Sequence, residues 1–443
     1  MHTLEQLRTG QLAGIRRLQL ACGLTDFPRE IFELADTLEI LDLSGNALSQ
    51  LPDDLPRLTK LRILFCSDNL FTELPEILGE CPDLTMIGFK ANRINQVSAR
   101  SLPAQLRWLV LTDNELEELP AAIGNCAQLQ KLMLAGNRLR TLPPELAACS
   151  RLELVRIAAN RLTELPDWLP MLPRLAWLAY AGNPFCEARE RDAIAGTAIA
   201  AIGWDRLQMQ HQLGEGASGV IHQAQLGYGD DARPAAVKLF KGAVTSDGLP
   251  RCEMAACIGA GAHPNLIPVL GQIADHPAGV QGLVMSLIDP AFGNLAGPPS
   301  LDSCTRDIYQ ENRRFTPAAM LAIAHGIASA ADHLHRRGIL HGDLYGHNIL
   351  HCEQGRSLLG DFGAASFYDP DAPGAAALQG LEVRAFGCLL EELSERCDAP
   401  AAFQPVLARL ALLRADCLLA DPASRPSFAQ IEWQLSGMIS ALS

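Results

Sequence analysis

Long apolar segments, paired cysteine motifs and a signal-like start are all missing from this sequence. It has no run of about 18 consecutive apolar residues, so it predicts no membrane-spanning helix. The 13 cysteines include no CxxC pair, and their odd number indicates reduced thiols rather than a disulfide framework or a zinc site. The start, MHTLEQLRTG, has no basic segment followed by an apolar run. We therefore expect a cytoplasmic protein, with export by a route that uses no cleavable signal as the alternative.

Positive charge is also in deficit. The chain has 36 Lys and Arg against 50 Asp and Glu, a formal net charge of −14 and a pI near 5.3. This balance argues against nucleic acid or an anionic membrane as a partner. With 443 residues, 48% of them hydrophobic, the chain is long enough for about three compact units, or for a repeat array plus a domain.

The first half repeats one template, seen in LEILDLSGNALSQLP and again in LRWLVLTDNELEELP. The L-x-x-L-x-L run places apolar side chains on one face of a short strand, and stacking the units buries that face. An asparagine in each unit can satisfy backbone groups where the chain bends. The pattern resembles the leucine-rich repeat over residues 15–185, which implies an α/β solenoid, a horseshoe, of about eight repeats. The asparagines recur every 22 or 23 residues, at Asn46, Asn69, Asn92, Asn114, Asn137, Asn160 and Asn183.

Large apolar side chains occupy the strand positions that would face the concave side of this horseshoe. A strip of such groups at the ~4.8 Å strand spacing is a larger exposed patch than a monomer normally has. We therefore expect a protein substrate or partner to bind there; the alternative is that another part of the molecule covers the strip. The predicted partner-binding residues are Ile40, Ile63, Phe65, Met86, Trp108, Val110, Met133, Leu154 and Trp177.

The remaining boundaries follow from where the repeat pattern starts and stops. Residues 1–14 precede it and are expected to form an N-terminal cap. Residues 186–203, CEARERDAIAGTAIAAIG, lose the pattern and predict a helical cap and linker, since a terminal repeat must cover its open end. Residues 204–443 then form a second domain.

A glycine-rich turn opens this second domain. In LGEGASGVIHQAQL, Gly214, Gly216 and Gly219 form G-x-G-x-x-G, and Val220 begins a strand-like segment where a dinucleotide-binding fold would need a helix. A strand, a glycine turn and a second strand let backbone N–H groups lie over phosphates. The turn therefore predicts a phosphate-binding loop.

After this turn, charged and amide side chains occur at positions that suit the binding of phosphate and metal. Lys238 interrupts the apolar strand AAVKLF, which is costly unless it meets an anion, and Glu253 in PRCEMAACIGAG is the nearest candidate partner. LHGDLYGHNIL then holds Asp343 and Asn348, and GDFG holds Asp361. Carboxylate and amide oxygens are ligands that Mg²⁺ prefers.

This order resembles a eukaryotic-like protein kinase over residues 206–436, a stretch that closes with DPASRPSF. Together with the repeats, the chain resembles the bacterial leucine-rich repeat protein kinase family, and the resemblance implies an α+β two-lobed domain that uses ATP and Mg²⁺. It implies that Asp343 accepts the proton of the attacking hydroxyl, Lys238 holds phosphates with the help of Glu253, and Asn348 and Asp361 bind the metal. The nucleotide-binding positions that it implies are Gly214, Gly216, Ser218, Gly219, Val220, Ala236, Lys238, Met285 and Leu287.

Three features depart from the family pattern. Gly342 stands where regulated kinases place an arginine that reads an activation-loop phosphate. Tyr345 stands where serine/threonine kinases usually have a lysine beside the transferring phosphate. Only residues 364–381 separate GDFG from the helix that starts near Glu382, and the family's A-P-E is absent, so Arg425 loses its expected partner and substrate recognition falls to the repeats.

The sequence therefore predicts a protein kinase that phosphorylates serine or threonine hydroxyls, with tyrosine as an alternative, and repeats that recruit a protein. Two other functions stay open. One is a weakly active ATP-binding scaffold whose repeats are the functional module. The other is a small-molecule phosphotransferase, which HGDL followed by N-I-L also resembles.

Overall fold

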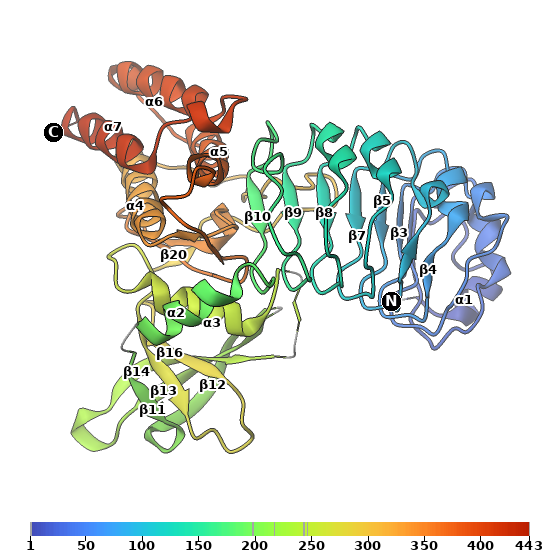
Figure 1. Cartoon of the computed structure of the whole chain (residues 1–443), viewed down its shortest axis with the longest axis horizontal. Coiled ribbons are helices and arrows are strands. Elements are labelled where there is room, and N and C mark those ends of the chain that lie inside the picture. Colours follow the sequence, from blue (N-terminus) through green and yellow to red (C-terminus); the bar gives the residue numbers. More distant parts are fainter. Residues whose placement is uncertain (1, 197–198, 217, 242–243, 246, 443) are drawn as a thin grey trace. The chain divides into compact units, whose positions relative to one another are not determined.

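The computed structural model describes residues 2–196, 199–216, 218–241, 244–245 and 247–442, and the chain forms two compact units (Figure 1). The first unit comprises residues 1–174 with 183–185, and the second comprises residues 175–182 with 186–443. The predicted boundary at residue 204 therefore differs from the structure, because the last repeat strand and the predicted linker both belong to the second unit. No helix in the described ranges is long and apolar enough to cross a lipid bilayer.

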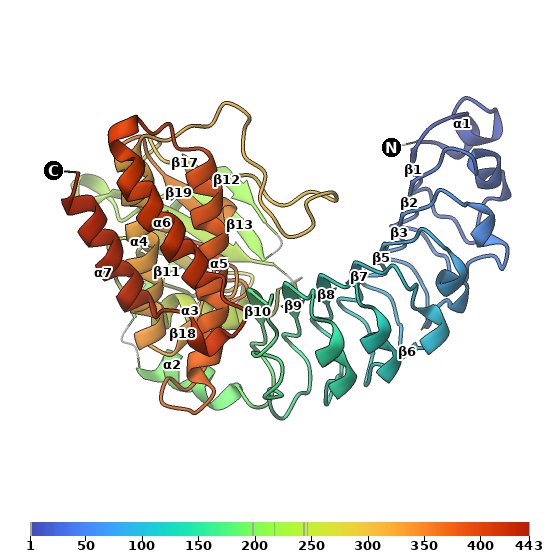
Figure 2. The same ribbon diagram turned by 90° about the horizontal axis from the view of Figure 1, so that it is seen from above.

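The first unit stacks short parallel strands with 3-10 turns on one side of them (Figure 2). Each strand of the main sheet is three residues long, and strands of successive repeats pair in parallel, as in Ile40 opposite Ile63. After helix α1 (Leu4–Arg8), the strands are β1 (Arg17–Gln19), β2 (Ile40–Asp42), β3 (Ile63–Phe65), β5 (Met86–Gly88), β7 (Trp108–Val110), β8 (Lys131–Met133) and β9 (Leu154–Arg156). The two-residue strands β4 (Glu73–Leu74) and β6 (Gln96–Val97) pair separately. The 3-10 turns are η1 (Arg29–Leu34), η2 (Leu55–Arg57), η3 (Glu76–Glu80), η4 (Ala99–Ser101), η5 (Ala121–Asn125) and η6 (Pro144–Ala148).

The repeat asparagines bond the backbone of adjacent repeats, as predicted. Asn69 accepts a hydrogen bond from the amide of Leu48 at 2.9 Å and donates to the carbonyls of Leu43 and Cys66 at 2.9 and 3.1 Å. The residue before it, Asp68, has φ +52°, and the corresponding residue of the other repeats is also left-handed. A side-chain amide with both ends satisfied therefore secures these bends between repeats.

The predicted apolar strip is largely buried, which corrects the expectation of a continuous exposed patch. Phe65 and Trp108 show the reason, because each packs against its neighbour along the strand layer. The Phe65 ring fills the space that a side chain at Gly88 would take, and the ammonium of Lys131 lies 4.2 Å from the centre of the Trp108 ring. Ile40, Phe65, Trp108 and Val110 are half-buried, and Ile63, Met86, Met133, Leu154 and Trp177 are buried.

The second unit contains a six-stranded sheet. Its strands lie in the order β11, β15, β16, β14, β13, β12, and all pairs are antiparallel except β11 with β15. One face of the sheet buries apolar side chains such as Val237 and Val284. Helix α3 (Pro250–Ala260) lies beside the sheet. The strands are β11 (Ala201–Gly203), β12 (Leu207–Glu215), β13 (Gly219–Leu226), β14 (Arg233–Phe240), β15 (Val269–Ala274) and β16 (Gly282–Ser286).

The predicted helical linker is only partly helical. Helix α2 spans Glu187–Gly196, and residues 197–198 lie outside the described residues. The segment then becomes strand β11, which pairs in parallel with β15. A sequence rich in Ala and Ile suits either a helix or a strand, so only pairing with the sheet decides its state.

Helices dominate the rest of the second unit (Figures 1 and 2). The Ala-rich segment forms α4, capped by Thr316, whose hydroxyl accepts a hydrogen bond from the amide of Ala319. The helices are α4 (Pro317–Arg336), α5 (Ala375–Glu395), α6 (Gln404–Cys417) and α7 (Phe428–Ser440). Short strands between them are β17 (Gly293–Asn294), β18 (Ile339–Leu340), β19 (Ile349–His351), β20 (Ser357–Leu359) and β21 (Ser366–Phe367), and β10 (Trp177–Ala179) also belongs to this unit.

Candidate active site

A pocket lies between the six-stranded sheet, α3 and the segment after β20. Its wall is mostly apolar, with side chains such as Leu283 and Met285, and it also holds Lys238, Glu253 and Asp361. This lining suits a small ligand with an apolar ring and a charged end.

Lys238 on β14 forms a buried ion pair with Glu253 on α3. Burial by itself lowers the pKa of Lys238, but the negative charges of Glu253 and Asp361 outweigh it and raise the pKa above its usual value. The lysine therefore stays charged in a pocket that also contains a second carboxylate. The predicted pairing of Lys238 with Glu253 agrees with this geometry.

The strand register corrects one predicted pocket residue. Ile221 lies opposite Lys238, and Leu283 lies opposite it on the other side, so these three side chains share the pocket face. Val220 instead pairs with Leu239, whose side chain packs against the apolar core on the other face of the sheet. Since successive strand residues point to opposite faces, Ile221 replaces Val220 at the pocket. The glycine pattern alone could not give this register.

The other predicted nucleotide positions lie near the pocket without all lining it. Ala236 pairs with Met285 and so shares the face of Lys238, two residues away along the strand. Gly216 and Ser218 lie between β12 and β13, Gly214 lies near the end of β12, and Gly219 begins β13. The amide of Gly216 donates to the carbonyl of Gly219 at 2.9 Å. Gly219 is needed there, because a side chain would meet the carbonyl of Leu239 at 2.6 Å. Leu287 follows the end of β16 and is half-buried.

Asp343 and Asn348 are bonded to one another in the loop between β18 and β19. Nδ2 of Asn348 donates to the main-chain oxygen of Asp343 at 2.9 Å and to its Oδ2 at 2.8 Å. This arrangement turns Oδ1 of Asn348 away from Asp343, where it can serve as a ligand for a cation. The loop thus presents one oriented carboxylate and one amide oxygen.

Gly342, immediately before Asp343, adopts a conformation that needs glycine. Its φ is +73°, and a Cβ there would lie 2.4 Å from the carbonyl oxygen of Ala364. Its amide donates to Oε1 of Glu382 at 2.6 Å, and the other oxygen of Glu382 accepts a 2.7 Å bond from Nε2 of His335. The buried Glu382 therefore holds the start of the loop, and no arginine side chain fits at residue 342.

The segment that follows Asp361 is short but ordered. Asp361 has φ +54°, and its Oδ1 accepts a 3.1 Å bond from the amide of Gly363. Strand β21 then pairs antiparallel with β18, and Tyr368 is buried with its hydroxyl donating to the carbonyl of His335 at 3.1 Å. Arg425 donates to the carbonyls of Leu419 and Gly380, both at 2.8 Å.

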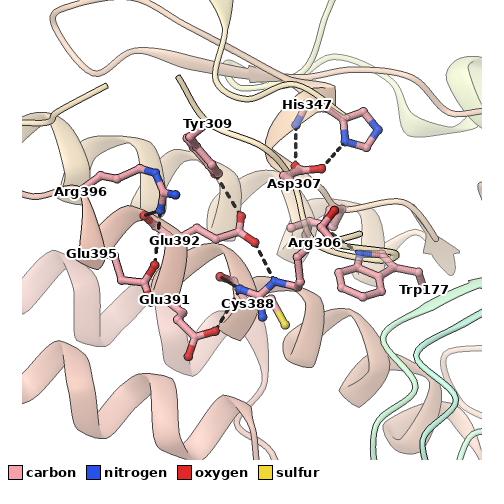
Figure 3. Close-up of polar contacts among 12 residues, drawn as sticks. Trp177, Arg306, Asp307, Tyr309, His347, Cys388, Glu391, Glu392, Glu395 and Arg396 are labelled. Atoms are coloured by element: carbon pink, nitrogen blue, oxygen red, sulfur yellow. Dashed lines mark hydrogen bonds and ion pairs between the residues drawn. The ribbon is translucent and has the colours of Figure 1, made fainter. Parts of the chain in front are cut away.

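An acidic residue outside every sequence motif also holds the loop of Asp343 (Figure 3). Asp307 accepts bonds from the main-chain amide of His347 at 2.9 Å and from its Nδ1 at 2.7 Å. The neighbouring Arg306 binds Glu391 and Glu392 of α5 at 2.9 and 2.8 Å. Sequence reasoning missed this residue because it lies 40 positions before its partner, with no spacing signal to link the two.

The donor set fits ATP with Mg²⁺. The apolar wall suits a purine, Lys238 suits phosphates, and the Asn348 amide and Asp361 carboxylate suit a hard cation. Within the described residues no group of three or more His, Cys, Asp or Glu side chains could hold a metal by itself.

Comparison with known proteins finds a matching family model in each part of the chain. Residues 207–380 match the family model for protein tyrosine and serine/threonine kinases, and residues 37–58 match the model for the leucine-rich repeat. The chain therefore contains leucine-rich repeats followed by a protein kinase domain.

Individual relatives agree with that composition. A probable serine/threonine-protein kinase of Arabidopsis thaliana is 29% identical over 106 residues, covering 24% of this chain and 13% of its own length. Fibroblast growth factor receptor 1 of Pleurodeles waltl is 24% identical over 294 residues, covering 54% of this chain and 35% of its own. A mouse leucine-rich repeat and calponin homology domain-containing protein is 31% identical over 111 residues, covering 24% and 16%. The chain spans at most about a third of these relatives, and a bacterial origin stays a prediction.

Proposed function

We propose that this protein transfers the γ-phosphoryl group of Mg-ATP to a serine or threonine hydroxyl of a protein, with tyrosine as the alternative acceptor. The observation that carries the proposal is the joint presence of a charged Lys238, held by Glu253, and an Asp343 oriented by Asn348. Phosphoryl transfer depends mainly on positioned charge, and these residues supply it. The match to the protein kinase family supports the same reaction.

Each side chain then has a defined task. Bound Mg-ATP supplies the phosphoryl group and a metal that neutralises its charge. Lys238 offsets phosphate charge, while Asn348 and Asp361 provide ligand oxygens for the cation. Asp343 accepts the proton of the attacking hydroxyl, and the bond from Asn348 keeps its carboxylate oriented for that step.

The repeats are proposed to form a curved solenoid that recruits the protein substrate or another partner. The half-buried Phe65, Trp108 and Val110 are the candidate contacts, since aromatic and apolar anchors dominate protein interfaces. Trp177, predicted to belong to the same strip, is removed from this set because its ring is occupied inside the second unit.

A weakly active ATP-binding scaffold is the second candidate. The observation that favours it is Tyr345, which is 5% exposed and stacked on Trp177 at 4.2 Å between ring centres. Its side chain therefore supplies no cation beside the transferring phosphate, where serine/threonine kinases usually have a lysine. A small-molecule phosphotransferase is the remaining alternative, and the test below includes it.

The test is phosphoryl transfer from γ-labelled ATP with Mg²⁺ to a bulk protein extract, run beside Asp343→Asn and Asp361→Asn. Label on protein that disappears in both variants supports a protein kinase. Nucleotide binding without label on protein supports the scaffold. Label that appears only on small molecules of the extract supports the phosphotransferase.

A further inference from the structure

The last repeat strand, β10, lies against the loop that carries Asp343. The indole N–H of Trp177 donates to the carbonyl of Leu344 at 3.1 Å. The Trp177 ring also stacks on Tyr345, with 4.2 Å between ring centres and 7° between planes. Trp177 and Tyr345 are 2% and 5% exposed, so the contact is buried. A stacked aromatic pair with a buried hydrogen bond fixes the two residues that follow Asp343.

The same segment reaches the strand after GDFG. The amide of Tyr180 donates to Oγ of Ser366 at 3.1 Å, and its hydroxyl donates to the carbonyl of Phe367 at 3.3 Å. Tyr180 is 1% exposed. Residues 366–367 form β21, which pairs with β18 directly before the loop of Asp343. Trp177 therefore holds the loop that follows β18, and Tyr180 holds β21, the strand that pairs with β18.

Close packing of main chain makes this arrangement possible. A Cβ at Gly342 would lie 2.7 Å from the carbonyl oxygen of Leu178, so any side chain at residue 342 would displace β10. In regulated kinases the residue here is an arginine that needs a phosphate to order the loop. In this chain the backbone of β10 takes up that space.

The connection extends to the helix that carries Glu253. Oε1 of Glu190, on α2, accepts a 2.7 Å bond from the amide of Gly182, and Oε2 accepts a 3.3 Å bond from Sγ of Cys252. Glu190 is 7% exposed, and Cys252 directly precedes Glu253 on α3. Within the second unit, Trp177 thus contacts the loop of Asp343, Tyr180 contacts the segment after GDFG, and Glu190 contacts α3.

We infer that Trp177, Tyr180 and Glu190 are positioning residues that act as a built-in brace and keep the active site ordered without phosphorylation. The brace takes the place of a phosphate-reading arginine, so a repeat-derived strand completes the kinase domain. The catalytic consequence rests on the proposed kinase function; the ordering itself does not.

The test compares the full-length chain with Trp177→Ala, Trp177→Phe, Tyr180→Phe and a control, Trp433→Ala. Trp433 is 78% exposed on α7 and has no part in the brace. Hydrogen–deuterium exchange reports the order of residues 339–350 and 362–368, and steady-state kinetics report kcat and the KM for ATP. Dephosphorylated protein is used throughout, so that phosphate cannot replace the brace.

We expect Trp177→Ala to increase exchange in both segments and to lower kcat by about tenfold or more, because small displacements of catalytic groups are costly. The KM for ATP should stay within about twofold, since the lost contacts do not line the nucleotide pocket. Trp177→Phe keeps an aromatic ring and should recover part of kcat, whereas the control should match the wild type.

Two results would overturn the inference. Unchanged exchange in Trp177→Ala would show that the strand does not order the loop, and a rise in phosphoryl transfer would show that it restrains the kinase. If Trp177→Ala does not fold, Tyr180→Phe removes one hydroxyl only and must still raise exchange at residues 366–368. If the wild type transfers no phosphate, the kinase proposal fails, while the exchange data still decide on the brace.

Discussion

Asp307 accepts hydrogen bonds from both the main-chain amide and the Nδ1 of His347, at 2.9 and 2.7 Å (Figure 3). His347 directly precedes Asn348, the proposed metal ligand that orients Asp343. The carboxylate of Asp307 therefore holds the turn that contains His347 and Asn348. The side chain of Asp307 is fully buried, so water cannot replace these bonds.

Asp307→Ala is predicted to lower kcat by about tenfold or more, because the turn loses two bonds and Asn348 loses its fixed position. Asp307→Asn keeps an acceptor for the main-chain amide and should lie between the wild type and Asp307→Ala. Steady-state phosphoryl transfer measures both. The matched control is Asp398→Ala, because the side chain of Asp398 is 73% exposed. If Asp307→Ala had the same kcat as this control, the positioning role of Asp307 would be excluded.

Glu392 makes the stability of the second unit depend on pH. Burial, with a further contribution from Asp307, raises the pKa of Glu392 to about 7, although Arg306 and the hydroxyl of Tyr309 bind its carboxyl. A carboxyl whose pKa is raised on folding contributes stability below its ordinary pKa of 4.5, and this contribution is lost as the pH rises through about 7.

Glu392→Gln should remove this dependence, since glutamine cannot ionise. The Tm of the wild type, relative to Glu392→Gln, is therefore expected to fall between about pH 5 and pH 8. Differential scanning fluorimetry over that range measures the difference, with Glu395→Gln, 62% exposed, as control. A difference that grows with pH would mean that the ion pair with Arg306 dominates.

Asn114 is predicted to be a major source of stability in the first unit. Its Oδ1 accepts from the amide of Ile94 at 2.9 Å, and its Nδ2 donates to the carbonyls of Phe89 and Leu111 at 2.8 and 3.1 Å. Asn114→Ala leaves these buried groups unsatisfied and should lower the free energy of unfolding by about 2–4 kcal/mol. Urea unfolding measures this free energy. Asn95 is exposed, so the control Asn95→Ala should change the free energy of unfolding by less than about 0.5 kcal/mol.

Partner capture through the repeats is expected to depend on Trp108 and Phe65. Truncating an aromatic anchor at an interface typically costs about 2 kcal/mol or more, so Trp108→Ala should weaken capture at least about 30-fold. Affinity capture followed by titration of the recovered partner measures this. Met171→Ala, 48% exposed, is the control, and undiminished capture by Trp108→Ala would end the recruitment hypothesis. Trp177 is unsuitable here, since it contacts the catalytic loop.

Local patterns in the sequence were sufficient for the repeat period, the bonding role of Asn69, the pairing of Lys238 with Glu253 and the joint loop of Asp343 and Asn348. Each of these features follows either from residue types at short spacing in the sequence or from the known order of motifs in a protein family. Strand register was not accessible in this way, and Val220 was therefore predicted in place of Ile221.

By itself, then, the sequence determined that repeats precede a kinase domain and which polar side chains could serve its chemistry, because hydrophobic periodicity and motif spacing are local properties. Only the tertiary structure decided that Trp177 packs on Tyr345 and that Asp307 holds His347. Trp177 and Tyr345 are 168 positions apart in the chain, and Asp307 and His347 are 40 positions apart. Nothing local in the sequence encodes such pairs, because they form only when separate elements pack and exclude water from their shared surface.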